Sequence, residues 1–265
     1  MENKVKNFST NNSSTAKLLL NKVPEITIFF WIIKILATTV GETAADFLSE
    51  NLNLGLALTS IIMAVLLVAA LFFQFKSPKY VPGLYWLVVV LISIVGTLVT
   101  DNLVDNLGVP LVVTTIIFAI ALTATFITWY SNEGTLSIHS ILTPKRETFY
   151  WVAILFTFAL GTAAGDLIAE GLNLGYGVSA FIFAALIGVV AFLHKQFQLG
   201  AVLSFWIAYI LTRPLGASLG DLLSQPQSAG GLGLGTVGTT ALFLLTILGV
   251  VIFLTITKKD ASKTA

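Results

Sequence analysis

The sequence predicts an all-α integral membrane protein whose eight transmembrane helices form four parallel two-helix repeats. Three observations carry this prediction: an apolar composition, an alternation of basic and non-basic connections, and a motif that occurs four times. Hydrophobic residues make up 56% and charged residues 10% of the 265 residues, and the mean hydropathy is +0.93. A soluble domain usually carries about a quarter charged residues, so the composition excludes that class.

Apolar stretches recur along nearly the whole chain, and each has the roughly 17–25 residues that cross about 30 Å of hydrocarbon. The helices that we expect from them span residues 26–49, 54–75, 83–105, 109–130, 149–170, 175–194, 199–224 and 235–257. The polar residues before the first helix contain no short apolar core with a small-residue cleavage site. We therefore expect no removable signal peptide, and the first helix to act as the targeting signal.

Basic residues follow every second predicted helix. Lys and Arg occur after the second, fourth and sixth helices and in both tails, whereas the connections in between, such as Glu50 to Leu54 and Gln225 to Leu234, hold none. The positive-inside rule then predicts that both termini are cytoplasmic. Lys34 and Arg213 are the exceptions, and both lie within predicted helices.

A framework of Trp, Gly and Asp with constant spacing occurs four times. The copies are Trp31/Gly41/Asp46, Trp86/Gly96/Asp101, Trp151/Gly161/Asp166 and Trp206/Gly216/Asp221. Each unit holds two helices, so all four cross the membrane in the same direction and are related by a pseudo-symmetry axis along the membrane normal. The predicted boundaries are 1–24 for a polar cytoplasmic N-terminal tail, 25–79, 80–133, 144–198 and 199–258 for the four repeats, and 259–265 for a cytoplasmic tail.

These four frameworks resemble a group of bacterial multi-pass proteins built from four tandem, tryptophan-bearing, two-helix repeats of unknown function, often labelled membrane-anchored. The resemblance covers roughly residues 24–257. It implies a location in the bacterial cytoplasmic membrane, and it implies no activity.

Polar residues at intervals of four form one stripe on each odd-numbered predicted helix. Residues four apart share a helix face, and polar groups at membrane depth turn toward the bundle interior or a water-filled cavity. We therefore expect a shared polar interior that opens toward the outside. The stripes are Lys34, Thr38, Glu42, Asp46, Glu50; Ser93, Thr97, Asp101, Asp105; Thr162, Asp166, Glu170; and Tyr209, Arg213, Asp221, Gln225.

The four framework Asp residues have two interpretations. As a ring of carboxylates, Asp46, Asp101, Asp166 and Asp221 would bind cations or relay protons. As structural residues, they would end the apolar spans or bond to hydroxyl groups on neighbouring helices. The residues alone leave both open.

Glu42 and Arg213 are the deeper candidates for the same pathway. A charge at the bilayer centre costs about 2.5–3.5 kcal/mol on insertion scales, so Glu42 requires a proton, a cation or a partner. Arg213 precedes Pro214, which indicates either a broken helix at a midplane site or a structural Arg that pairs with Glu42 or an Asp beside a tolerated kink. We expect Lys34 to snorkel to the cytoplasmic interface.

The remaining framework residues have structural interpretations. We expect the glycines to permit close helix crossing and the tryptophans to anchor the helices at the membrane interface. These residues are Gly41, Gly96, Gly161 and Gly216, and Trp31, Trp86, Trp151 and Trp206.

Several function classes lack the residues that they need. The chain has no cysteine, no zinc-binding pair of histidines and no serine elbow, so we expect neither an enzyme nor a cofactor. A net charge of +1 without a basic patch argues against a nucleic-acid partner. The expected partners are the lipid bilayer and a small cation or proton, while the sequence sets neither a metal nor an oligomeric state.

Two functions follow from these expectations. The first is a cation or proton-coupled transporter, because acids outnumber bases along the stripes. The alternative is a non-transporting scaffold or partner subunit whose Asp residues lock the repeats together. An interior in which every carboxylate is paired would favour the scaffold, and a polar cavity that reaches Arg213 and Glu42 would favour transport.

Overall fold

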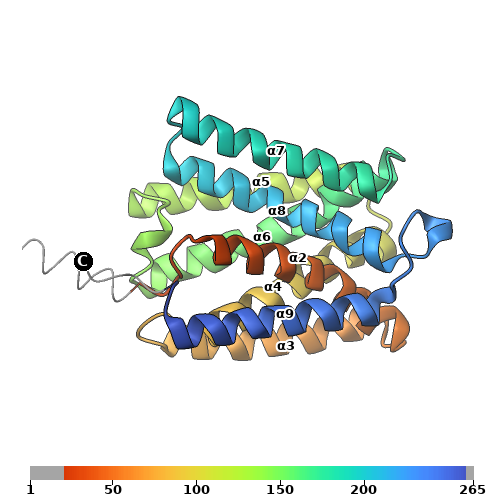
Figure 1. The fold of residues 1–265 in the computed structure, drawn as a ribbon, viewed down its shortest axis with the longest axis horizontal. Helices are drawn as coiled ribbons and strands as arrows, with labels where there is room; N and C mark the ends of the chain where they lie inside the picture. Colours follow the sequence, from red (N-terminus) through yellow and green to blue (C-terminus); the bar gives the residue numbers. More distant parts are fainter. Residues whose placement is uncertain (1–20, 261–265) are drawn as a thin grey trace, which may run out of the picture.

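The computed structural model describes residues 21–260, in which eight long helices lie side by side in one bundle (Figure 1). All eight are long and apolar enough to cross a membrane, and no strand occurs among the described residues. The predicted fold class is therefore confirmed. The helices are α2 (Ile28–Asp46), α3 (Gly55–Lys76), α4 (Pro82–Asp101), α5 (Leu111–Glu133), α6 (Pro144–Asp166), α7 (Tyr176–Phe197), α8 (Ala201–Ser224) and α9 (Gly235–Thr257).

Short helical turns complete the chain. Three are π-helical and follow α2, α4 and α6 directly, and two are 3-10 turns in connections. They are η1 (Phe47–Asn51), η2 (Asn102–Asn106), η4 (Leu167–Gly171), η3 (Ile138–Ser140) and η5 (Gln227–Ala229). Residues 1–20 and 261–265 of the predicted tails lie outside the described residues.

The start of α6 differs most from the predicted helices. The prediction began at residue 149, after the charged segment Lys145 to Glu147, whereas α6 begins at Pro144. Thr143 is the N-cap, and its hydroxyl accepts a hydrogen bond from the backbone N–H of Arg146 at 3.3 Å. A capping threonine followed by proline favours a helix start, so the charged turn is helical although it is not apolar.

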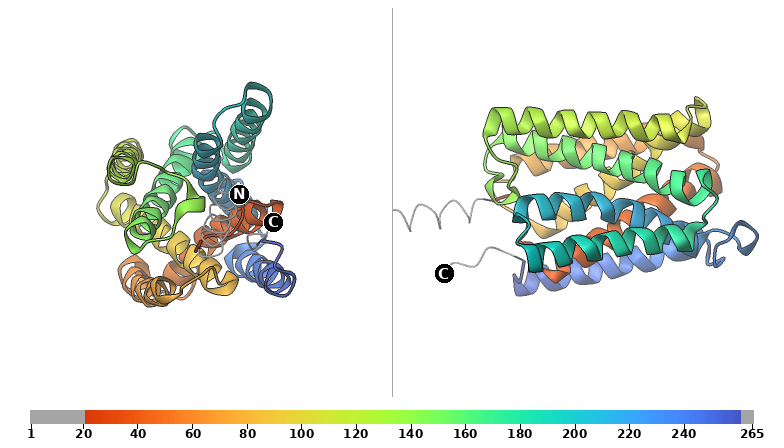
Figure 2. Two further views of the ribbon diagram at one scale, coloured as in Figure 1. Left: turned by 90° about the vertical axis from the view of Figure 1, so that its left-hand side faces the viewer. Right: turned by 90° about the horizontal axis from the view of Figure 1, so that it is seen from above.

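The helices divide into an inner ring and an outer layer, as the end-on view shows (Figure 2, left). In α2, α4, α6 and α8, between 56% and 78% of the apolar window is buried; in α3, α5, α7 and α9 the share is 22–28%. The outer helices expose large apolar side chains such as Ile61, Ile120, Phe181 and Leu245. A helix that is apolar on its exposed face is suited to contact with lipid.

The four repeats close into a ring. Each inner helix contacts the next one along the chain, and α8 returns to contact α2. The outer helix of each repeat packs against the inner helix of the following repeat: α3 on α4, α5 on α6, α7 on α8, and α9 on α2. The repeats are therefore related by a pseudo-fourfold axis that runs along the bundle.

The four framework glycines lie at the four crossings of the inner ring. In each case an added Cβ would overlap the side chain at one fixed position of the next repeat. The pairs are Gly41 with Ser93, Gly96 with Phe158, Gly161 with Arg213, and Gly216 with Thr38. The absence of a side chain therefore allows these helices to approach closely.

Aromatic rings fill the end of the bundle where the chain termini meet. Each framework Trp packs against the aromatic residue that precedes the Trp of the previous repeat, with ring centroids 5.5–6.3 Å apart. The pairs are Phe30 with Trp86, Tyr85 with Trp151, Tyr150 with Trp206, and Phe205 with Trp31. We call these eight residues the aromatic layer.

The prediction that the tryptophans anchor the helices at the lipid interface is wrong for three of them. Trp86 is 1% exposed, and Trp151 and Trp206 are 4% exposed. Their rings stabilise the contacts between repeats, because aromatic rings in edge or tilted contact bury large apolar areas.

Residues near both ends of the described segment, 21–260, are bonded to the bundle beside the aromatic layer. The backbone N–H of Glu25 donates to the carbonyl of Asp260 at 2.9 Å. Lys22 forms a buried ion pair of 2.7 Å with Glu147. The Tyr80 hydroxyl donates to the Asp260 carboxylate at 2.5 Å, and burial together with the charge of Asp260 raises the pKa of Tyr80. The end of the predicted N-terminal tail is thus packed against the bundle.

Candidate functional site

The polar stripes of the inner helices meet along the axis of the ring. Positions that correspond in the four repeats form successive levels, beginning near the aromatic layer and ending at the opposite end of the bundle. The levels are Thr38, Ser93, Phe158, Arg213; then Glu42, Thr97, Thr162, Ala217; then Asp46, Asp101, Asp166, Asp221; then Glu50, Asp105, Glu170, Gln225.

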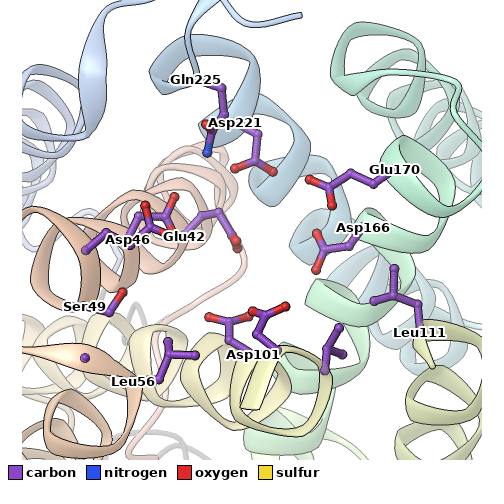
Figure 3. Close-up of a pocket in the computed structure, with 14 residues that line it drawn as sticks. Glu42, Asp46, Ser49, Leu56, Asp101, Leu111, Asp166, Glu170, Asp221 and Gln225 are labelled. Atoms are coloured by element: carbon purple, nitrogen blue, oxygen red, sulfur yellow. The ribbon is translucent and has the colours of Figure 1, made fainter. Parts of the chain in front are cut away.

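A cavity of about 430 Å³ lies between the ends of the inner helices that are far from the chain termini. Figure 3 shows carboxylates from all four inner helices or the turns that extend them, directed into this space. Its lining within residues 21–260 contains no Lys or Arg, and the eight carboxylates are those of Glu42, Asp46, Glu50, Asp101, Asp105, Asp166, Glu170 and Asp221. We call this space the acidic cavity.

The acidic cavity runs from an exposed rim to a buried floor. Glu50, Asp105 and Glu170 at the rim are exposed. Asp221 is 7% exposed and Glu42 is 6% exposed. The sequence predicted this order, with Glu42 deeper than the Asp ring.

Three of the four inner helices change from α-helical to π-helical winding at the Asp ring. In the first three repeats the α-helix ends at Asp46, Asp101 or Asp166 and continues as a π-helical turn, whereas α8 remains α-helical to Ser224. Single π-helical turns are rare and occur frequently at functional sites. The rim carboxylates Glu50, Asp105 and Glu170 lie on these π-helical turns.

The Asp ring does not bind the neighbouring hydroxyls that one form of the structural interpretation proposed. No hydrogen bond or ion pair joins these four carboxylates to any residue of the described chain. Hydroxyls of the outer helices instead bond to inner-helix residues beside the ring: Ser60 with Asn102 at 2.8 Å, Ser179 with Ser218 at 2.7 Å, and Thr240 with Thr43 at 2.7 Å.

Arg213 lies behind the floor of the acidic cavity, where it binds the floor residue Glu42. Its side chain is fully buried, and its Nη2 donates to Glu42 Oε2 at 3.0 Å, to Thr162 Oγ1 at 2.7 Å and to Thr97 Oγ1. Its Nη1 donates to the carbonyl of Thr38 at 3.3 Å. One guanidinium from the fourth repeat thus binds the corresponding position of each of the other three.

The helix around Arg213 is continuous. The break that the Arg213–Pro214 pair suggested is absent, because α8 passes through Pro214 and remains helical to Ser224. Proline removes one backbone hydrogen bond from a helix, and the surrounding inner helices hold α8 in place. Arg213 therefore reaches Glu42 from a regular helix.

Lys34 is buried one level closer to the aromatic layer than Arg213. The predicted snorkelling is wrong, because the side chain is 0% exposed and its Nζ lies 4.2 Å from the Phe158 ring centroid and 4.3 Å from that of Tyr209. The ammonium has no hydrogen-bond partner among the described residues. Phe30 in the aromatic layer lies one helical turn closer to the terminal end, so aromatic rings separate Lys34 from that surface.

Two of the contacts at the floor were not among the candidate site residues. Thr97 and Thr162 lie in the predicted stripes, but only the charged residues were selected from those stripes. The repeat alignment could have identified them, because both occupy the position of Glu42 in their own repeats.

Three carboxylates of the acidic cavity form a group that could bind a metal ion. Glu42, Asp166 and Asp221 each offer one oxygen, and these oxygens lie within 4.8 Å of one another. Oxygen ligands of this kind suit hard cations.

Comparison with known proteins gives a family without an assigned activity. A family model described as Repeat of Unknown Function (DUF347) matches residues 29–80, 84–135, 149–198 and 204–260. Neither the curated proteins nor the solved structures contain a match.

Proposed function

We propose that this chain, which belongs to the DUF347 repeat family, moves cations across a membrane through the centre of its inner helix ring. One observation carries the proposal: among the described residues, eight carboxylates and no basic side chain line a cavity that extends to the buried Glu42, the ion-pair partner of Arg213. Rings of acidic side chains concentrate cations and repel anions.

The floor of the cavity would act as the gate. Arg213 holds Glu42, Thr97 and Thr162 together, and the aromatic layer lies beyond it. A cation that leaves the cavity in that direction must separate these contacts. We propose that protons drive this step, since Glu42 would exchange its partner Arg213 for a proton when the gate opens.

The scaffold alternative has less support. A scaffold would use the Asp ring to bind neighbouring repeats, but the contacts between repeats are made by glycine crossings, aromatic pairs and hydroxyl bonds. The four Asp carboxylates lack such partners among the described residues.

The orientation completes the proposal. We propose a bacterial cytoplasmic membrane with both termini in the cytoplasm, which places the acidic cavity on the outer side. A fluorescent protein fused after Ala265 should be fluorescent, and a periplasmic phosphatase fused there should be inactive. The reverse pattern would contradict this orientation.

Flux into proteoliposomes tests transport directly. Wild type would be compared with a variant that carries Asn at positions 46, 101, 166 and 221, with Glu42→Gln and Arg213→Gln as single variants. Monovalent and divalent cations would be supplied with and without a pH gradient. We expect saturable uptake in wild type and its loss in the fourfold variant.

The control neutralises carboxylates away from the acidic cavity. Glu25→Gln with Glu133→Gln removes two charges near the opposite end of the bundle and should leave uptake intact. Absence of uptake of every cation by folded wild type would refute transport. Unfolding of the fourfold Asn variant would instead give the Asp ring a structural role.

A further inference from the structure

We infer that the floor of the acidic cavity is a binding site for one hard divalent metal cation, formed by Glu42, Asp166 and Asp221. The inference deepens the proposed function by naming the class of cargo. Only the statement that the bound ion is carried rests on that function, because binding can be measured without transport.

The geometry fits a single ion. The three carboxylates come from α2, α6 and α8, point toward one another in Figure 3, and each place one oxygen within 4.8 Å of the others. Hard divalent cations bind carboxylate oxygens at about 2.0–2.6 Å, so two oxygens bound to one ion are at most about 4.0–5.2 Å apart. The 4.8 Å limit on the separations of these three oxygens is compatible with one shared ion.

Asp221 independently indicates a missing partner. Its side chain is only 7% exposed, it makes no hydrogen bond or ion pair with a described residue, and its carboxylate is directed into the cavity (Figure 3). Buried charged groups are normally paired or coordinate a metal. A cation between Asp221 and Asp166 would supply the partner that the protein does not.

The charge balance favours a divalent ion. When ionised, the three carboxylates carry three negative charges, and within the described part of the chain Arg213 is the only basic side chain bonded to any of them. Two negative charges remain, and one divalent cation neutralises them. A monovalent cation would leave a buried net charge at the same place.

The ligand atoms select the class of metal. The described residues that line the cavity include carboxylates and an amide but no His, Cys or Met. Oxygen-only sites suit Ca²⁺, Mg²⁺ and Mn²⁺, whereas Zn²⁺ and Cu²⁺ favour nitrogen and sulfur ligands. Asp101 lines the same cavity from α4, the inner helix that contributes none of these three carboxylates.

Arg213 would compete with the ion for Glu42. The guanidinium occupies Glu42 Oε2 at 3.0 Å, so coordination by that oxygen requires Arg213 to release it. A neutral residue at position 213 should therefore strengthen metal binding, while Arg213→Lys retains the competing charge.

Binding of Mn²⁺ to the purified full chain tests the inference. Free Mn²⁺ gives a six-line electron paramagnetic resonance signal that is lost on binding, so a titration gives affinity and stoichiometry. We expect one saturable site per chain, from which Ca²⁺ or Mg²⁺ but not K⁺ displaces Mn²⁺.

Matched variants separate a site from general negative charge. Asp221→Asn and Asp166→Asn should each weaken binding by about tenfold or more. Asp105→Asn makes the same chemical change at the exposed rim of the same cavity and should weaken binding by less than about threefold, because exposed charges are screened. Equal losses for Asp105→Asn and Asp221→Asn would refute a defined site.

Two further outcomes are decisive. Absence of saturable Mn²⁺ binding, or displacement of Mn²⁺ by K⁺ as readily as by Ca²⁺, would overturn the inference using wild type alone, whatever the stability of the variants. Saturable binding without uptake into proteoliposomes would support the metal site and refute transport. Uptake of monovalent cations without Mn²⁺ binding would support transport and refute the metal site.

Discussion

The guanidinium of Arg213, in the last repeat, is bonded to the carboxylate of Glu42, in the first, at 3.0 Å in the centre of the ring. The residues are 171 positions apart in the sequence, and the hydroxyls of Thr97 and Thr162 complete the cluster. All four repeats therefore meet at one buried side chain.

Glu42→Gln should reduce the stability of the folded chain. Removal of one partner from a buried ion pair costs about 3–5 kcal/mol, because the other charge stays buried without compensation. Glu42→Gln combined with Arg213→Gln should cost less than the two single changes added together, since neither charge is then left alone. Denaturant unfolding in micelles measures all four proteins, and additive losses would show that the two groups do not interact.

Gly41→Ala should weaken the crossing of α2 and α4. The new Cβ would overlap the Ser93 side chain and lie 3.0 Å from its backbone carbonyl carbon, which requires the helices to separate. Overpacking of this kind costs about 1–3 kcal/mol. Gly188→Ala in α7 is the control, because nothing lies within 4 Å of the added atom, and alanine favours a helix over glycine by about 1 kcal/mol. Equal unfolding midpoints for the two variants would contradict the close crossing.

A disulfide should link the last helix to the first. Thr43 and Thr240 place their hydroxyl oxygens 2.7 Å apart, and the chain contains no native cysteine, so Thr43→Cys with Thr240→Cys gives a single reactive pair. After cleavage at a protease site inserted between α5 and α6, the two halves should stay joined until they are reduced. Thr43→Cys with Thr246→Cys should separate at once, because Thr246 is exposed on the outer layer. Separation of the first pair without reductant would argue against the closed ring.

Lys34→Met should stabilise the chain or leave its stability unchanged. The Lys34 Nζ is fully buried without a hydrogen-bond partner among the described residues, and methionine has a similar length without the polar nitrogen. Replacement of buried ionic groups by apolar ones is often neutral or stabilising by about 1–4 kcal/mol. Lys76→Met, at the exposed end of α3, should shift stability by less than about 0.5 kcal/mol. A clear loss of stability in Lys34→Met would mean that the two aromatic rings compensate the charge.

The properties that depend on local sequence were predictable. Helix positions follow from apolar stretches, and the direction of the polar stripes follows from the four-residue period that links Glu42, Asp46 and Glu50. The common membrane direction of the repeats follows from two helices per unit. These features need no knowledge of which helix lies beside which.

The features that depend on neighbours were not predictable. A buried Trp86 and an interfacial tryptophan occupy the same depth and have the same spacing, and only the packing of Phe30 from another repeat distinguishes them. The burial of Lys34 likewise depends on Phe158 and Tyr209, which lie far away in the chain. The π-helical turn after Asp46 lacks a recognised residue pattern, since it differs from an α-helix by one residue in the winding.

The closed ring has a consequence for how such a chain could begin and end. The junction between the last repeat and the first is equivalent to the other three, and the backbone at Glu25 is bonded to that at Asp260. If the present ends were joined and the gene were opened before α4, α6 or α8, every inner helix would keep its neighbours and every outer helix its place. In this sense the ring of inner helices has neither a first nor a last member.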